Sequence, residues 1–248
     1  MNKAINNKKI TSNNATPDLT LENHYVQKII SIAQQMIREN KPMKIEKLYN
    51  KSIKELDINS NELFKIIQYL VNQKVLIDGS KHTRNTILSN SYRNKLYQVI
   101  SENHGASFNF LRKKVFSNTS GSGGQLIWHL QMLIKFNYIK KIKINNYTVF
   151  IPYDMDTELG KLFFFMKDGL NEKIINIINN QEKIRKPDVY KILDESRSNV
   201  NYRIKNLLEH DILKVIDNTT KIVSIHPNIE KKLTQIIKKN VRILDYNQ

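Results

Sequence analysis

The sequence predicts a mainly α-helical protein with small β-hairpins, an α+β fold arranged as three similar modules in tandem. Apolar residues recur at spacings of three and four along most of the chain, which is typical of helices with one buried side. In two places short apolar runs around a polar turn replace this period, which predicts β-hairpins. Three of the predicted helices also align in one frame, and such internal repetition indicates repeated modules.

The predicted organisation has six segments. They are residues 1–20, a basic tail; 21–89, the first module; 90–152, the second module; 153–170, a connector helix; 171–227, the third module; and 228–248, a C-terminal helix. The tail is rich in Asn, Lys and Thr and has little apolar surface to bury, so we expect it to be disordered.

The first module is expected to hold three helices and a brief hairpin. Its first helix stops near Asn40, before Pro42, because proline cannot continue a helix. Ser60 is a candidate N-cap for the third helix. The apolar run 75–77 is expected to form a short strand, and Asp78-Gly79 is a turn signal.

The second module ends in the most informative stretch of the chain, residues 121–152. Leu126, Leu130 and Leu133 form the apolar stripe of a helix. Asn137 follows the stripe, and asparagine tolerates the left-handed conformation that ends many helices. Two apolar runs then flank Asn145-Asn146, which predicts a hairpin with a two-residue turn.

The third module repeats this pattern, with Ser196 or Ser198 as the N-cap of its third helix and a hairpin around residues 217–221. The three stripes are Leu63/Ile67/Leu70, Leu126/Leu130/Leu133 and Val200/Ile204/Leu207. A helix-stopping residue follows the last member of each stripe by four positions, at Lys74, Asn137 and Asp211. Three such matches in order are hard to obtain by chance, so they favour three related modules.

The run WHLxxLxxFNYI, from Trp128 to Ile139, resembles the HLxxLxxxGLI run of ArsR- and MarR-like regulators. The glycine-rich start of this helix and its Trp-His pair are similar to those of archaeal tandem winged helix-turn-helix transcriptional regulators. The resemblance covers most of residues 21–152. It implies that the helix is a recognition helix, that the hairpin is its wing, and that the protein binds double-stranded DNA to regulate transcription.

The charge of the chain agrees with this implication. The sequence has 40 Lys and Arg against 23 Asp and Glu, a formal charge of +17, which favours DNA, RNA or an acidic membrane face as partner. A lysine-rich solvated surface is the competing interpretation. No apolar run approaches the roughly 20 residues needed to cross a bilayer, and the N-terminus lacks a signal peptide, so we expect a cytoplasmic protein without membrane insertion.

In a winged helix the third helix lies in the major groove and the wing meets the backbone or the minor groove. Gln and Asn can pair with adenine, and Ile can contact the methyl group of thymine. The candidate DNA-contacting residues are Gln125, Ile127, Trp128, Gln131, Lys140, Lys141, Lys143, Asn146, Asn199, Asn201, Tyr202, Arg203, Lys205 and Lys221. For Trp128, packing against the wing or a partner chain is favoured over contact with DNA, and a solvated polar face competes for the third module.

The sequence gives no support for catalysis or for a cofactor, so an enzyme is not expected. There is no cysteine, and the six histidines have no metal-ligand spacing. Residues 120–124 form a glycine-rich turn that could bind a phosphate or serve only as a flexible turn. The alternative function is a tandem winged-helix scaffold of the ESCRT-II-like or RNA-polymerase-associated kind, favoured by Phe64, Ile127 and Trp128 on supposed DNA-facing sides. A second protein chain, or a second copy of this chain in a homodimer, is the candidate partner besides double-stranded DNA.

Overall fold

The computed structural model describes residues 19–38, 41–116, 123–234 and 236. It contains two compact units, which we call unit 1 (Met1–Asn85) and unit 2 (Thr86–Gln248) and describe separately. The predicted tail over residues 1–18, most of the glycine-rich turn, and the end of the C-terminal helix lie outside the described residues.

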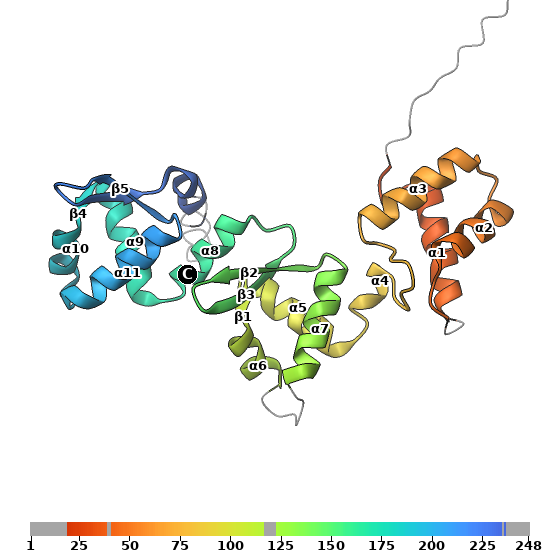
Figure 1. Cartoon of the computed structure of the whole chain (residues 1–248), viewed down its shortest axis with the longest axis horizontal. Helices are drawn as coiled ribbons and strands as arrows, with labels where there is room; N and C mark the ends of the chain where they lie inside the picture. The colour runs from red at the N-terminus through yellow and green to blue at the C-terminus, as the bar shows by residue number, and fades with distance from the viewer. Residues whose placement is uncertain (1–18, 39–40, 117–122, 235, 237–248) are drawn as a thin grey trace, which may run out of the picture. The chain divides into compact units, whose positions relative to one another are not determined.

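Helices dominate the structure and small antiparallel sheets complete it, as the sequence predicts (Figure 1). The helices are α1 (His24–Arg38), α2 (Ile45–Glu55), α3 (Ser60–Asn72), α4 (Arg84–Ile87), α5 (Ser91–Glu102), α6 (Phe108–Phe116), α7 (Gly123–Lys135), α8 (Thr157–Met166), α9 (Gly169–Gln181), α10 (Lys186–Leu193) and α11 (Arg197–Glu209). The strands are β1 (Ala106–Ser107), β2 (Ile139–Ile144), β3 (Tyr147–Pro152), β4 (Ile184–Arg185), β5 (Leu213–Asp217) and β6 (Ile222–Ile225). Among the described residues, no helix combines the length and apolar character that crossing a bilayer requires.

Unit 1 packs α1, α2 and α3 around one apolar core, and its predicted strand at residues 75–77 is wrong. Val75 and Leu76 are buried, and both of their N–H groups donate to the carbonyl of Leu70, so they complete the end of α3. The following turn bonds to Met43 instead of forming a hairpin: Gly79 donates to the Met43 carbonyl and Met43 donates to that of Ser80. No strand occurs in the described part of unit 1.

Unit 2 contains the same order of elements twice: helix, short strand, helix, helix and hairpin. The first set is α5, β1, α6, α7, β2 and β3, with strand order β1-β3-β2. The second set is α9, β4, α10, α11, β5 and β6, with strand order β4-β6-β5. Both hairpins predicted for this part of the chain are therefore confirmed, whereas the two-residue strands β1 and β4 were not predicted because they are too short to show an alternating pattern.

The ends of α3, α7 and α11 have the same geometry. Lys74, Asn137 and Asp211 adopt left-handed backbone conformations, with φ of 54°, 55° and 58°. The next residue in each case donates its N–H to the carbonyl of the last stripe residue, at 2.9, 3.0 and 2.9 Å. This bond closes the carbonyl end of a helix. The aligned helix-stopping positions predicted from sequence are confirmed in all three places.

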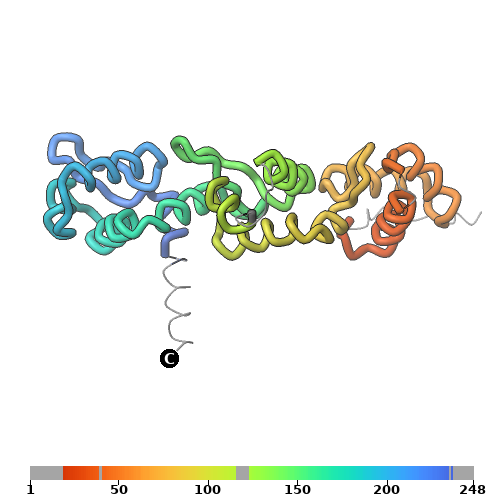
Figure 2. The backbone as a smooth tube through the Cα atoms, turned by 90° about the horizontal axis from the view of Figure 1, so that it is seen from below, coloured from red at the N-terminus to blue at the C-terminus, as the bar shows by residue number. Residues whose placement is uncertain are grey.

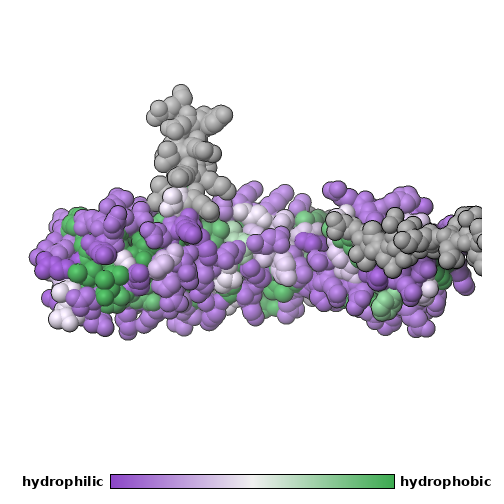
Figure 3. All heavy atoms as spheres, turned by 90° about the horizontal axis from the view of Figure 1, so that it is seen from above, coloured by the Kyte–Doolittle hydropathy of each residue, from purple (hydrophilic) through white to green (hydrophobic). Residues whose placement is uncertain are grey.

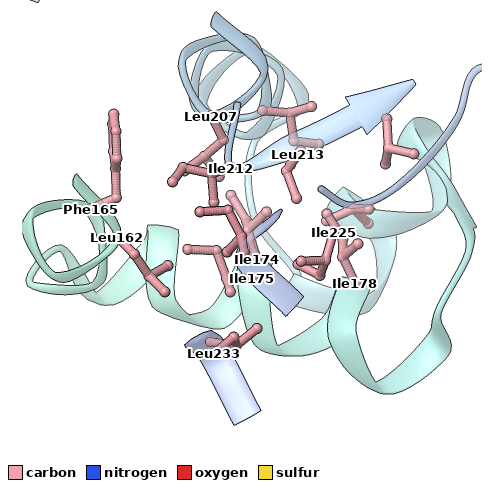
Figure 4. Packing of buried hydrophobic residues seen from close by; sticks show 14 of the residues in the cluster. Leu162, Phe165, Ile174, Ile175, Ile178, Leu207, Ile212, Leu213, Ile225 and Leu233 are labelled. Atoms are coloured by element: carbon pink, nitrogen blue, oxygen red, sulfur yellow. The ribbon is translucent and has the colours of Figure 1, made fainter. Parts of the chain in front are cut away.

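The predicted connector helix is α8, which lies between the two sheet-bearing halves of unit 2 (Figure 1 and Figure 2). One apolar cluster runs from the inner face of β2–β3 through Leu162 and Phe165 of α8 into the core around α9. In Figure 4, Ile174 and Ile175 lie between Ile212 on one side and Leu233 on the other. Leu233 belongs to a further helical stretch, residues 227–234, where the sequence predicts the C-terminal helix.

Candidate nucleic-acid interface

The predicted outward side of α7 is exposed. Leu126, Leu130 and Leu133 are buried as the predicted seam, which turns the rest of the helix toward solvent. Gln125 and Gln131 are exposed on that outer side. α7 thus presents amide side chains that can donate and accept hydrogen bonds.

Trp128 is half-buried against α5, whereas the sequence favoured packing on the wing or on a partner chain. Its ring lies under the guanidinium of Arg93, 5.7 Å from the ring centroid, and contacts the ring of His129 at 4.9 Å. Arg93 belongs to α5 and is itself buried, with Nε donating to the carbonyl of Ile87 at 2.7 Å. Trp128 therefore packs on Arg93 of α5, and it leaves 49% of its surface exposed beside Ile127, which is 47% exposed.

His129 of α7 points into the protein interior. It is buried and stacks on Tyr92 with ring centroids 5.5 Å apart. Burial, and secondarily the positive charge of Arg93, lower the pKa of His129, so the neutral imidazole is favoured. This position fits a packing role, and the described residues contain no group of His, Asp and Glu that could hold a metal ion.

The hairpin β2–β3 divides its lysines between two faces. Lys141 pairs with Phe150 and Lys143 with Thr148, so these lysines share the outer face with their partners. Both lysines are exposed. Lys140 pairs with Ile151 on the opposite face, which packs on α8, and is only partly exposed. The structure therefore brings two of the three predicted hairpin lysines to the side of α7.

A groove of about 420 Å³ separates α7 from the outer face of the hairpin. Its walls include Ile127 and Gln131 of α7, Lys141 of β2, and the first two residues of α6, Phe108 and Asn109. The N–H groups in the first turn of a helix favour negatively charged ligands. The groove therefore combines a lysine, amides and a helix N-terminus between the two elements predicted to contact DNA.

The outward side of α11 carries amide, aromatic and charged side chains. Asn201, Tyr202 and Lys205 are exposed, Tyr202 by 63% of its surface, whereas Asn199 is only partly exposed. Lys205 lies 3.7 Å from Glu209 in a surface ion pair, a kind that contributes little. The N-cap is Ser196, whose hydroxyl accepts from the N–H of Asn199 at 3.3 Å, which decides between the two candidate caps.

Arg203 already has a partner within the protein. Its Nη1 lies 2.7 Å from Oδ2 of Asp168, and the other oxygen of that carboxylate accepts the first N–H groups of α9. A guanidinium held this way is compensated by the carboxylate. Lys221, by contrast, is exposed in the turn between β5 and β6. Of the two predicted cations, Lys221 remains accessible and Arg203 is committed to an internal contact.

Several residues that line these surfaces were not predicted as contacts. Tyr147 is 51% exposed at the tip of the hairpin, and Asn206 lies beside Tyr202 on α11. The position of Tyr147 next to the Asn145-Asn146 turn was the available signal, since residues at a hairpin tip are usually exposed. Nothing local in the sequence marks Asn206, because its place depends on α11 lying near the hairpin tip.

In unit 1, α3 presents Phe64, Lys65 and Gln68 to solvent, as its seam predicts. Phe64 is 60% exposed. An aromatic ring of this exposure has no hydrogen bond to offer a base edge, so α3 differs chemically from α7.

Comparison with known proteins supports a helix-turn-helix protein. No protein-family model matches the chain. Over 155 residues the chain is 26% identical to an uncharacterized HTH-type transcriptional regulator of Methanocaldococcus jannaschii. The match covers 62% of this chain and 37% of that protein, so the chain spans little more than a third of its relative's length. The sequence is thus similar, at low identity, to an archaeal helix-turn-helix transcriptional regulator.

Proposed function

We propose that this protein is a DNA-binding transcriptional regulator built from tandem winged helix-turn-helix modules of the ArsR- and MarR-like kind. α7 and α11 serve as recognition helices, and β2–β3 and β5–β6 serve as wings. The main support for the proposal is the exposed side of α7: Gln131 lines a groove that Lys141 of β2 also lines, and Gln125 is exposed on the same helix. The similarity to an HTH-type regulator supports the same conclusion.

The chemistry of this surface matches the two kinds of contact that DNA offers. Exposed glutamines can form paired hydrogen bonds with adenine in the major groove. Lys141 and Lys143 can neutralise phosphates, and each neutralised phosphate releases counterions. Lys140 and Arg203 are not assigned such contacts, because one lies on the α8 side of the hairpin and the other is paired with Asp168. The proposal requires no catalysis and no cofactor.

The proposal is tested by the binding of a DNA duplex of about 30 base pairs, roughly three helical turns, at several salt concentrations. Replacing Lys141 and Lys143 together with alanine is expected to weaken binding and to reduce the slope of log affinity against log salt by about 1.8, or 0.9 for each lost contact. Fluorescence anisotropy with an end-labelled duplex gives both quantities.

A matched control removes the same charge elsewhere. Lys173 and Lys231 are exposed on α9 and on the helical stretch 227–234, away from the groove, and their double alanine variant should keep the slope. Equal losses in both variants would mean that only net charge attracts DNA. A wild-type protein that binds no duplex at low salt would refute the proposal.

A second candidate function is a protein-interaction scaffold. It is favoured by Ile127 and Trp128, which are exposed beside each other on α7, because large apolar side chains at a surface often mark protein contacts. Purification from the native source distinguishes the two: nucleic acid that accompanies the protein favours the regulator, and a stoichiometric second polypeptide without nucleic acid favours the scaffold.

A further inference from the structure

The surface beside α7 continues to α11. A second groove, of about 530 Å³, is lined by Asn145, Asn146 and Tyr147 of the hairpin tip and by Tyr202 and Asn206 of α11. Asn146 and Tyr147 also line the groove beside α7. The hairpin tip is therefore a wall common to both grooves, and the surface beside Ile127 and Gln131 of α7 continues past it to Tyr202 and Asn206 of α11.

The hairpin tip is held against the second half of unit 2. Nε2 of His210, just after α11, lies 2.8 Å from Oδ1 of Asn145. The ring centroids of His210 and Phe165 of α8 are 5.3 Å apart, and those of Tyr147 and Phe164 are 5.6 Å apart. A hairpin tip fixed in this way keeps a constant position relative to α11.

The connection through α8 is equally tight. Gly160 packs so closely on β3 that an added Cβ would lie 2.9 Å from Cδ1 of Ile151. Lys167 reaches back from the end of α8 to donate to the carbonyl of Gly105 at 2.5 Å, and His104 stacks on Phe163 at 4.3 Å. Together with the shared apolar cluster, these contacts join the two halves of unit 2 as one packed body.

We propose that α7 and α11 contact one continuous DNA duplex as a single rigid unit, with the Asn145–Tyr147 turn between the two contacts. This inference rests on the proposed function. Its consequence is that one chain recognises a composite site: two blocks of base pairs at a fixed spacing, without the need for a second copy of the chain. Linking two contacts rigidly raises affinity because the second contact forms within the complex.

The first experiment selects duplexes from a random library of about 40 base pairs, roughly four helical turns, with the full-length protein. We expect enriched duplexes to contain two blocks at one spacing. The double variant Asn201→Ala, Tyr202→Ala should lose one block, and the double variant Gln125→Ala, Gln131→Ala should lose the other. Asn180→Ala is the control, since Asn180 is also an exposed helical asparagine but lies on α9, outside both grooves.

The second experiment inserts base pairs between the two blocks of a selected duplex. Each base pair rotates one block by about a tenth of a turn, so an insertion of about five places it on the opposite side of the duplex. A rigid unit cannot follow, and affinity should fall by roughly a hundredfold, to that of one block. For the protein variants of the first experiment, circular dichroism checks that the helices are intact.

The outcomes separate this inference from the proposed function. Enrichment of a single block, or α11 variants that select the same duplexes as wild type, would overturn the rigid two-helix unit while leaving DNA binding in place. Affinity that does not depend on the inserted length would also overturn it, because it would show independent contacts. Failure to enrich any duplex would refute the proposed function itself.

Discussion

Neighbouring residues of α7 have opposite environments, because successive side chains of a helix point about 100° apart. Trp128 is half-exposed over Arg93, whereas His129 is buried against Tyr92. The buried histidine contributes to packing only while it is neutral, because a charged imidazolium in this place would lose its hydration and lie near the positive charge of Arg93.

This environment predicts a pH-dependent stability. The pKa of His129 is lowered from its ordinary value of 6.5, so the unfolded chain binds the proton at a higher pH than the folded protein does. The contribution to stability is complete above the ordinary pKa and is lost as the pH falls toward the lowered one. We expect the free energy of unfolding from urea titrations to decrease between neutral pH and pH values near 5, below the ordinary histidine pKa of about 6.5.

His129→Phe keeps an aromatic ring against Tyr92 and removes the titrating group, so its loss of stability over the same range should be smaller. The pKa of His210 is also lowered, mainly by burial, and His210→Phe should remove a further part of the slope. A wild-type slope that persists in the double variant would contradict this explanation.

At the scale of elements, the three helix ends show how local chemistry can specify a boundary. Lys74 differs in side chain from Asn137 and Asp211, yet each of the three follows its apolar stripe at the same distance and adopts a left-handed conformation. The buried residue after each of Lys74 and Asp211 fixes the direction in which the chain leaves the helix. The element that follows nevertheless differs, since only α7 and α11 lead into hairpins.

The close packing of α8 on β3 predicts that a larger side chain at position 160 destabilises unit 2. Gly160 faces Ile151, which is fully buried and cannot move into solvent. We expect Gly160→Val to destabilise unit 2 by about 1–3 kcal/mol, the usual cost of overpacking. Urea unfolding monitored by Trp128 fluorescence measures this loss.

Gly169→Ala is the matched control for a glycine at a helix position. An added Cβ at Gly169 meets no atom within 4 Å. Alanine there should be neutral or stabilising by up to about 1 kcal/mol, since it restricts the unfolded chain. A Gly160→Val protein as stable as wild type would show that α8 can shift away from β3.

For the whole molecule, the two units have cores of their own. The apolar cluster of unit 1 lies among α1, α2 and α3, and the cluster around α8 and α9 lies within unit 2. The single tryptophan of the chain, Trp128, belongs to unit 2. Tryptophan fluorescence therefore reports the unfolding of unit 2, whereas far-ultraviolet circular dichroism reports the helices of both units.

We expect the two signals to give different urea midpoints for the full chain, because separate cores unfold as separate cooperative units. A chain limited to residues 86–248 should keep the fluorescence midpoint and lose the additional circular dichroism transition. Coincident midpoints for the full chain, together with a shifted midpoint for the shorter one, would show that the units stabilise each other.

Features that depend on residues close together in the chain could be predicted from the order of the amino acids. The buried seams of α3, α7 and α11, the helix-ending residues and both hairpins follow from spacing, since period and turn chemistry act over a few positions. The exposure of Gln125, Gln131, Lys141 and Lys143 follows from the same periods.

Features that join residues far apart in the chain could not be predicted in this way, because they arise when the chain folds back on itself. Arg203 and Asp168 are 35 positions apart, and their contact withdraws a predicted phosphate ligand. His210 and Asn145 are 65 positions apart, and their contact fixes the hairpin tip beside α11. Residues 75–77 did not form a strand because the N–H groups of Val75 and Leu76 donate to the carbonyl of Leu70 and the adjoining turn bonds to Met43. Spacing along the chain specifies which side of an element is buried, but which partner covers it depends on how the chain folds back.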